Sequence, residues 1–419
     1  MHSEDFATQL ALYETGTAPS RTEAIKIFRK HRTRLKDWRI LYADDSPDGP
    51  FPLRRCRFSE TGFVSTLFTG HSLWILDDDL LSSSGPQMFK TGYGTYIDSN
   101  PAGYIRSLAY RENPSENLLG FCRSLSAYFS HDELAHINPY LYLWEAQRDR
   151  SLKTVNAIRE TIAALLALPH LKRPLDAEWG KQYRMLYREQ AEAEADQLLF
   201  PFYQEPDAGL AGALEQELDI LECVLVRTKL IELSSKKSPQ NKMNELMQFM
   251  HHELSAIMLR ELFVCADILF HDNMTQMSRK LSGLDMKKDP FGLLRNCARD
   301  LHMLRHMERL TNSLYDRDDT AFYIPSFITF DRDIADIIQL TELQAIALHR
   351  TSGAVYPLCN TPLMSWLSER LGQKRFISAE HIFREKGFST RAEGRRRVNV
   401  KSLLEEDKAK LAELISRRH

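Results

Sequence analysis

Residues 94–100 read Gly-Thr-Tyr-Ile-Asp-Ser-Asn, and this stretch decides the fold that we expect. Its centre is β-branched and aromatic, which is typical of a short buried strand, and Asp98 follows the strand directly. A second run of the same kind, residues 324–330 (IPSFITF), precedes Asp331. We therefore predict two buried parallel strands, each followed by a carboxylate.

A third short apolar run, residues 72–76 (SLWIL), lies upstream of these two. The long segment between the two carboxylate-ending strands has a helical character. In residues 151–285 there is almost no alternation of period two, and apolar residues recur at helical spacing. One such stripe consists of Met243, Leu246, Met247, Met250, Leu254, Ile257 and Met258. The pattern predicts an α/β fold interrupted by a large all-α insertion, with the methionines in its core.

This pattern divides the chain into four parts. A split α/β domain is predicted over residues 71–150 and 286–345, and the helical insertion over residues 151–285. The flanking residues 1–70 and 346–419 are predicted to be basic N-terminal and C-terminal regions.

The overall composition excludes several classes of protein. The chain has 419 residues, 55 basic and 57 acidic side chains, and 43% hydrophobic residues, so it is neither a polycation nor a disordered chain. No apolar run approaches the roughly 20 residues of a membrane span, and the N-terminus does not resemble a secretion signal. The six cysteines include no C-x-x-C pair. We expect a soluble cytoplasmic protein that does not engage a membrane.

Basic side chains are concentrated near both ends of the chain. Residues 21–39 hold eight basic and two acidic groups, and residues 370–419 hold 14 basic and seven acidic groups, including Arg395, Arg396 and Arg397. Such segments either follow a phosphate backbone or form ordinary solvated helices. The sequence leaves both interpretations open.

The two strand-ending carboxylates indicate a particular chemistry. The carboxyl ends of parallel strands form the edge of a sheet where ligands bind in α/β folds. Carboxylates gathered there suit Mg²⁺ or Mn²⁺, which prefer oxygen ligands. Two such ions activate water and stabilise the leaving oxygen of a phosphodiester.

Four motifs, taken in order, resemble those of PIN-domain nucleases. Residues 96–100 (YIDSN) resemble the first-strand signature of that family, and residues 138–145 (NPYLYLWE) resemble the helix that carries its second acid. The third match is residues 300–305 (DLHMLR), which we expect to open a helix. The fourth is residues 328–331 (ITFD), which resemble the family's last strand. The resemblance extends over roughly residues 72–150 and 286–345, which is about a third of the chain.

The resemblance implies a PIN-like parallel sheet flanked by helices. It also implies the identity of the site residues. The metal-binding acids, which hold Mg²⁺ or Mn²⁺, would be Asp98, Glu145, Asp300 and Asp331. Asn100 and Thr329 would be supporting polar groups. The 155 positions between Glu145 and Asp300 exceed what a compact PIN domain needs, so the helical block is interpreted as an insertion.

Further acids compete for two of these positions. Asp77, Asp78 and Asp79 follow the SLWIL run and compete with Asp98, or else form an exposed acidic turn. Asp316, Asp318 and Asp319 compete in the same way with Asp300. Glu145 could itself be an ordinary exposed glutamate of a helix.

Histidine pairs suggest zinc, but none has a complete ligand pattern. His252-Glu253 lacks the second histidine of H-E-x-x-H, and His302 and His306 lack a third ligand. We interpret these, and the pair His131 and His136, as surface or packed histidines. The sequence contains no P-loop, dinucleotide-binding turn or nucleophile elbow.

From these observations we predict a metal-dependent endoribonuclease with RNA as its partner. The resemblance also implies a toxin or defence role, and the helical insertion is a candidate surface for a protein partner. Two competing hypotheses stay open: a non-catalytic helical adaptor, and a DNA-acting nuclease of the flap type.

Overall fold

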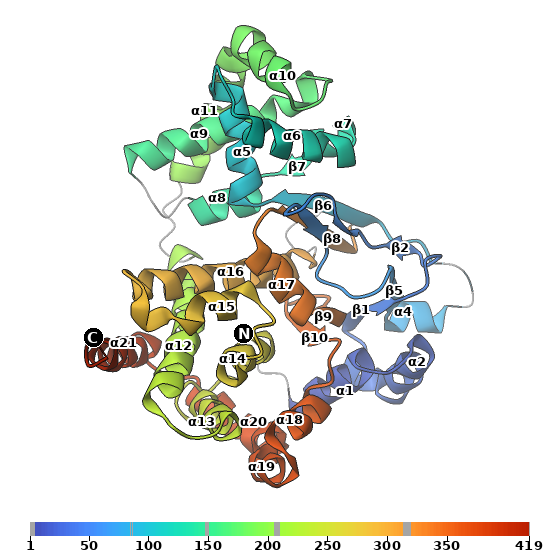
Figure 1. Ribbon diagram of the computed structural model, residues 1–419. Helices are drawn as coiled ribbons and strands as arrows, with labels where there is room; N and C mark the ends of the chain where they lie inside the picture. Colours follow the sequence, from blue (N-terminus) through green and yellow to red (C-terminus); the bar gives the residue numbers. More distant parts are fainter. Residues whose placement is uncertain are drawn as a thin grey trace.

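In the computed structural model, the chain forms two five-stranded sheets with helices packed against them (Figure 1). The structure describes residues 5–83, 85, 87–146, 151–204, 210–312 and 320–418, except for the side chains at 202, 204 and 210–214. This mixed architecture confirms the expected α/β class. Within the described ranges, no helix combines the length and the apolar character needed to cross a membrane.

One sheet contains the predicted pair of strands. β6 (Thr91–Ile97) and β8 (Phe322–Thr329) lie side by side and run parallel, as their sequences predicted. β7 (Ile137–Asn138) continues the sheet parallel to β6. On the other side of β8, β4 (Phe63–Ser65) and β3 (Arg55–Arg57) are added in antiparallel orientation. The two predicted strands are therefore central in a mixed sheet.

The second sheet has the order β10-β9-β1-β5-β2, and every pair in it is antiparallel. Its strands are β1 (Trp38–Asp44), β2 (Phe51–Pro52), β5 (Ser72–Leu76), β9 (Leu343–His349) and β10 (Val355–Cys359). The SLWIL run is thus a strand, but it pairs with β1 and does not join β6 and β8. The two regions described as basic from the sequence supply β1 to β4 and β10, so they also build both sheets.

Both faces of the second sheet are covered, so its strands alternate between two hydrophobic cores. In β1, Ile40 and Tyr42 face a small core, whereas Leu41 and Ala43 face the largest one. The helices of the small core are α1 (Phe6–Gly16), α2 (Arg21–Lys30) and α3 (Arg32–Leu35). This alternation explains why the strands are apolar almost throughout.

The helices in the upper part of Figure 1 form a core of their own. Trp179 and Tyr183 are fully buried there, and Ile97 and Ile328 enter it from the sheet. The helices are α5 (Ser99–Tyr110), α6 (Glu116–Tyr128), α7 (His131–Ala135), α8 (Tyr140–Ala146), α9 (Leu152–Leu166), α10 (Ala177–Gln182) and α11 (Arg188–Gln204). This core covers the carboxyl ends of β6 and β8.

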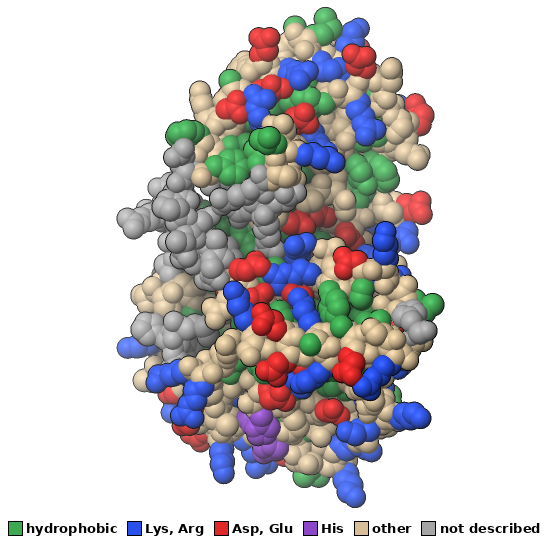
Figure 2. All heavy atoms as spheres, turned by 90° about the vertical axis from the view of Figure 1, so that its left-hand side faces the viewer, with side chains coloured by type: hydrophobic (Ala, Val, Ile, Leu, Met, Phe, Trp, Pro, Cys, Tyr) green, Lys and Arg blue, Asp and Glu red, His purple; other side chains and the backbone are tan. Residues whose placement is uncertain are grey.

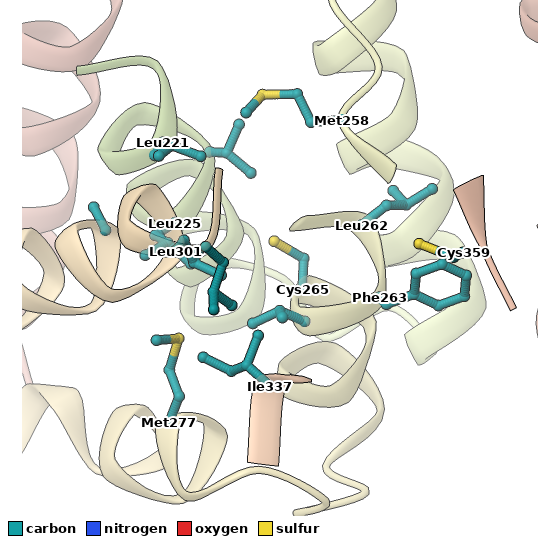
Figure 3. Packing of buried hydrophobic residues seen from close by; sticks show 14 of the residues in the cluster. Leu221, Leu225, Met258, Leu262, Phe263, Cys265, Met277, Leu301, Ile337 and Cys359 are labelled. Atoms are coloured by element: carbon teal, nitrogen blue, oxygen red, sulfur yellow. The ribbon is translucent and has the colours of Figure 1, made fainter. Parts of the chain in front are cut away.

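The remaining helices lie below the sheets in Figure 1 and pack around the largest core. Figure 3 shows Leu225, Cys265, Leu301 and Ile337 meeting there from four different helices. The helices are α12 (Leu210–Ser234), α13 (Pro239–His252), α14 (Leu259–Phe270), α15 (Gln276–Ser282), α16 (Pro290–Leu310), α17 (Arg332–Leu340), α18 (Leu363–Leu371), α19 (Gln373–Ala379), α20 (Glu385–Gly394) and α21 (Val400–Ser416). A short helix, α4 (Asp78–Ser82), follows β5.

The regular structure described between residues 151 and 285 is entirely helical, which confirms that prediction. Met243, Met247 and Met250 are fully buried, so the methionine stripe belongs to the core, as expected. The block is nevertheless shared between two cores. Helices α9 to α11 pack with the upper helices, whereas α12 to α15 pack with α16 and α17.

Candidate carboxylate site

Asp98 and Asp331 occupy equivalent places at the carboxyl ends of β6 and β8. Asp98 follows β6 directly, Asp331 follows β8 after one intervening residue, and each caps the next helix. The Asp98 carboxylate accepts a hydrogen bond of 2.7 Å from the Ser99 N–H, and the Asp331 carboxylate accepts one of 2.8 Å from the Asp333 N–H. Because β6 and β8 are neighbours in register, these caps bring the two acids to the same edge of the sheet.

Thr329 connects these two acids. Its hydroxyl donates to Asp98 Oδ2 at 2.6 Å and accepts from the Asp331 N–H at 2.8 Å, and its side chain is fully buried. These contacts suit the supporting role expected for Thr329. Asn100 is exposed in the first turn of α5, and among the described residues it makes no hydrogen bond with these acids.

Glu145 reaches the same edge from α8. The Asn138 side chain accepts from the Tyr140 N–H at 2.9 Å at the start of this helix, as its capping sequence predicted. The Ser99 hydroxyl donates to the Glu145 carboxylate. Ser99 therefore contacts both acids: its backbone N–H donates to Asp98, and its hydroxyl donates to Glu145.

Asp300 lies in the middle of a helix, not at its beginning. We expected a helix opening at Asp300, but α16 begins ten residues earlier, so that prediction is wrong. The start signal is Asp289-Pro290, because Asp289 accepts from the Gly292 N–H at 2.9 Å and Pro290 fits the first turn. The mid-helix position fixes Asp300 more firmly than an end position would.

A tryptophan holds the helix of Glu145 against the helix of Asp300. The Trp144 ring lies edge-on to His302 and His306, with centroid distances of 4.6 and 3.9 Å. Both histidines are buried, and His302 Nε2 lies 3.2 Å from Glu217. The histidine pair with i, i+4 spacing is therefore packed, as we interpreted it.

Asp333 joins the four predicted acids, and we call Asp98, Glu145, Asp300, Asp331 and Asp333 the carboxyl cluster. Burial raises the pKa of Asp300 well above its usual range, and the charges of the other four members raise it further. The pKa of Asp98 rises to about 7 through burial and the charge of Glu145, although hydrogen bonds from Thr329 and Ser99 oppose this. The structure thus brings all four predicted acids together.

The cluster lies at the waist of the molecule. Figure 2 views the side on which α8 and α16 lie, and acidic side chains gather there between the upper helices and the lower body. Asp98 and Asp333 are buried, whereas Glu145, Asp300 and Asp331 are half-buried. The half-buried acids leave the cluster open to a small ligand from solvent.

Two members of this site were not identified from the sequence. Asp333 is only two positions after Asp331, so the D-R-D spacing was an available signal. Lys280, on α15, forms an ion pair with Asp333, and no local pattern marks it. Its pKa is raised: burial lowers it, but the hydrogen bond with Asp333 and the charges of Asp331 and Asp300 outweigh burial.

The donor chemistry of the cluster can be tested against a metal ion. Within the described residues, no three Asp, Glu, His or Cys side chains are arranged closely enough to hold one. The cluster nevertheless consists of carboxylates that repel one another, with one lysine as the neighbouring cation. Carboxylates are the ligands that Mg²⁺ and Mn²⁺ prefer, and a cation relieves their repulsion. The residue types therefore fit a hard divalent cation.

The three acids that follow the SLWIL run lie apart from the cluster. Asp77 is fully buried, caps α4 and pairs with Arg39 at 3.0 Å, so it is not part of an exposed turn. It follows β5, which belongs to the second sheet, whereas Asp98 and Asp331 follow strands of the first. Asp78 is half-buried and pairs with Arg32, and Asp79 is exposed and pairs with Arg350.

Three acids compete with Asp300 in the sequence, namely Asp316, Asp318 and Asp319, and they lie outside the described residues.

The remaining zinc-like motifs are held by unrelated contacts. Glu253 pairs with Arg227 at 3.0 Å, beside an exposed His252. His131 Nε2 lies 3.0 Å from the Leu168 carbonyl, and His136 Nδ1 lies 2.6 Å from the Asp132 carbonyl. These contacts agree with surface or packed histidines.

The two basic segments differ in their surroundings. In the N-terminal segment, Arg21, Lys26, Arg32 and Arg39 all pair with acids. The run Arg395–Arg397 follows α20, is exposed, and has no ion pair with any residue that the structure describes. The C-terminal run therefore keeps its charge available at the surface.

Comparisons of this chain with protein-family models, with curated proteins and with solved structures gave no match.

Proposed function

We propose that this chain is a metal-dependent endoribonuclease that hydrolyses RNA phosphodiester bonds. The observation that carries the proposal is the gathering of like charges around Asp300. Burial and the charges of four other carboxylates raise the pKa of this residue. Such an arrangement destabilises the metal-free protein, and strongly perturbed acids of this kind concentrate at functional sites. Their place at the ends of two adjacent parallel strands is where α/β folds bind ligands.

In this proposal, Asp98, Glu145, Asp300 and Asp331 hold Mg²⁺ or Mn²⁺. The bound metal supplies charge neutralisation at the phosphate and an activated water. Thr329 orients Asp98 through its 2.6 Å hydrogen bond, and Ser99 orients Glu145. The scheme needs no covalent nucleophile, so the acids need only be positioned, which Trp144 assists by holding α8 on α16.

A PIN-like core is the finer fold that we propose. Its support is the order of the acids: one after β6, one on α8, one on α16 and one after β8. The toxin or defence role remains an implication of that resemblance alone. The exposed Arg395–Arg397 run is proposed to contact the RNA backbone, and the helical block is proposed as a surface for a protein partner.

One observation favours the competing adaptor hypothesis. No three side chains of the described part of the chain are arranged to hold a metal ion, so catalysis requires the carboxylates to move closer together. A non-catalytic adaptor requires no such movement. Metal binding to the purified protein, measured directly, separates the two hypotheses.

The test of the proposed function compares RNA and DNA strands of identical sequence, with Mn²⁺ or with a chelator. We expect cleavage of RNA only with Mn²⁺, and no cleavage by Asp98→Asn, which removes one charge without adding bulk. The matched control is Asp79→Asn, because Asp79 is 57% exposed and pairs with Arg350 outside the cluster. Cleavage of DNA in preference to RNA would indicate a flap-type nuclease. Wild-type activity in Asp98→Asn would exclude the site.

A further inference from the structure

The amino-terminal halves of β6 and β8 leave part of the sheet uncovered. Parallel strands are usually buried on both faces by aliphatic side chains. Here the upper helices bury Ile97 and Ile328, but Thr95 and Tyr93, on the same face of β6, lie beyond them. Tyr93 is 58% exposed, at a position where β6 pairs with β8 alone, because β7 pairs only with Thr95 and Tyr96. The sequence therefore places a hydroxyl and an aromatic ring where a covered strand would carry aliphatic residues.

This uncovered face forms the floor of a pocket of about 430 Å³. That volume is within the range of small-molecule sites. The segment that joins β2 to β4 and the helix α7 supply its sides. In Figure 1, α7 lies over β6 on the right, whereas α8, which carries Glu145, lies beyond the other end of β6. The pocket is therefore separate from the carboxyl cluster.

Hydroxyl groups line the floor. Thr95 Oγ1 and Ser326 Oγ lie 3.2 Å apart across the two strands. Thr66, also in the lining, is 1% exposed, and its hydroxyl has no hydrogen-bond partner among the described residues. Leaving a buried hydroxyl without a partner costs about 1–3 kcal/mol. This hydroxyl is itself shielded from solvent, so the floor presents a ligand with the Thr95 and Ser326 pair.

The charged groups at the rim do not favour an anion. Arg54 pairs with Glu133 at 2.5 Å and lies over the Phe129 ring, so its charge is compensated. The Asp132 carboxylate is 96% exposed and adds a negative charge. A carboxylate accepts hydrogen bonds only, so it favours a ligand with hydroxyl donors and disfavours a phosphate.

We propose that this pocket binds an uncharged sugar ring, carried by a free sugar or by a nucleoside. The ring packs its apolar face against Tyr93, and its hydroxyls hydrogen-bond with Asp132 and with the Thr95 and Ser326 pair. In the nucleoside case, the pocket holds one unit of an RNA strand, and only that version rests on the proposed function.

The test measures binding to the metal-free protein in chelator, so that no cleavage is involved. The probes are ribose, glucose, adenosine, 2′-deoxyadenosine and inorganic phosphate, titrated by calorimetry and by ligand-observed NMR. We expect saturable binding of ribose or adenosine, and weaker binding of 2′-deoxyadenosine. Tyr93→Ala should weaken binding several-fold, because it removes the aromatic surface against which the sugar ring packs. Thr95→Val should also weaken binding, and it keeps the shape of the side chain.

The matched control is Phe200→Ala, because Phe200 is 65% exposed on α11, away from the pocket, and should leave binding unchanged. Binding of glucose and ribose assigns the pocket to free sugars, and binding of adenosine alone assigns it to nucleosides. Tighter binding of phosphate, no saturable binding, or equal affinity in Tyr93→Ala overturns the proposal. Asp98→Asn should retain the binding, which distinguishes failure of this pocket from failure of the proposed nuclease.

Discussion

Lys280 on α15 and Asp333 on α17 form an ion pair at the edge of the carboxyl cluster. The partner carboxylate is almost completely buried, whereas Lys280 is 41% exposed on its side-chain surface. The lysine therefore compensates part of the charge of the cluster, at Asp333, Asp331 and Asp300. A divalent cation bound to these acids would neutralise the same carboxylate charges as the lysine.

We predict that Lys280→Met lowers the melting temperature in chelator but increases the stabilisation by Mn²⁺. Removing the ammonium leaves a buried carboxylate without its counter-charge, which destabilises the folded state. Binding of an added cation then stabilises the folded state more, because the cation no longer competes with the lysine for the carboxylates. Thermal melts with and without millimolar Mn²⁺ measure both effects.

The control for this experiment is Lys237→Met. Lys237 pairs with Glu245 at 2.9 Å, but both side chains are exposed, and such a pair contributes about 0–1 kcal/mol. Its Mn²⁺ response should equal that of the wild type. An equal response in Lys280→Met would contradict the balancing role.

The pH dependence of stability gives a second prediction. Burial and the Glu145 charge raise the pKa of Asp98 from 3.8 to about 7. A raised pKa means that the folded state keeps a proton that the unfolded state releases. The resulting stabilisation is complete below about pH 4 and is lost as the pH rises through about 7.

In chelator, the melting temperature should therefore decrease between about pH 4 and pH 7, and Mn²⁺ should reduce this decrease. Other groups also titrate in this range, so the informative comparison is with Asp98→Asn, which cannot ionise. The variant should show a shallower decrease. Parallel curves for the two proteins would mean that Asp98 is not held in a strained, ionised state.

Thr329 gives a third prediction, which concerns activity. Thr329→Val keeps the shape but removes the hydroxyl that donates to Asp98 and accepts from the Asp331 N–H. Loss of a group that orients a metal ligand typically costs about 10-fold to 100-fold in metal affinity or activity. We expect a loss of that size in the Mn²⁺ dependence of RNA cleavage.

Thr341→Val is the matched control for Thr329→Val. Thr341 is also buried, but its hydroxyl donates to the Ile337 carbonyl within its own helix at 2.7 Å. Both variants lose a buried hydroxyl, so a comparable loss of activity in the two would indicate general destabilisation and not a role at the carboxyl cluster.

The exposed arginines give a fourth prediction. Replacing Arg395, Arg396 and Arg397 with alanine should weaken RNA binding and flatten its salt dependence by up to about 0.7 log units per lost phosphate contact. Turnover at saturating RNA should change little, because α20 lies at the opposite end of the lower body from β6 and β8 in Figure 1. Filter binding over a salt series tests this. Identical slopes would identify the run as a solvated surface.

Several parts of the site were predictable because their signals are local. The strand before Asp98 and the strand before Asp331 are short runs, and each of these two acids caps the helix that follows. Glu145 was predictable from the Asn138-Pro139 start of its helix. Local composition decides such elements, since capping and periodicity depend on neighbours in the chain.

The membership of the sheets was not predictable in the same way. Ser72–Leu76 has the same character as β6 and β8, yet it pairs with β1 in the other sheet. A short strand that is apolar on both faces can pair with many other strands. Its partner is decided by the packing of side chains in the two cores that it contacts. The start of α16 differs in kind, because Asp289-Pro290 is a local start signal that lies ten residues before the Asp300 motif.

By itself, the sequence determined which elements form and which acids end the central strands, because those features depend on adjacent residues. Only the tertiary structure decided that four other carboxylates act on Asp300 and that Lys280 pairs with Asp333, since Lys280 is 53 positions from Asp333. Burial, which raises the pKa values of Asp98 and Asp300, also exists only once the helices have packed over the strand ends. Charge and proximity across the chain are properties of the packed fold, and no local pattern encodes them.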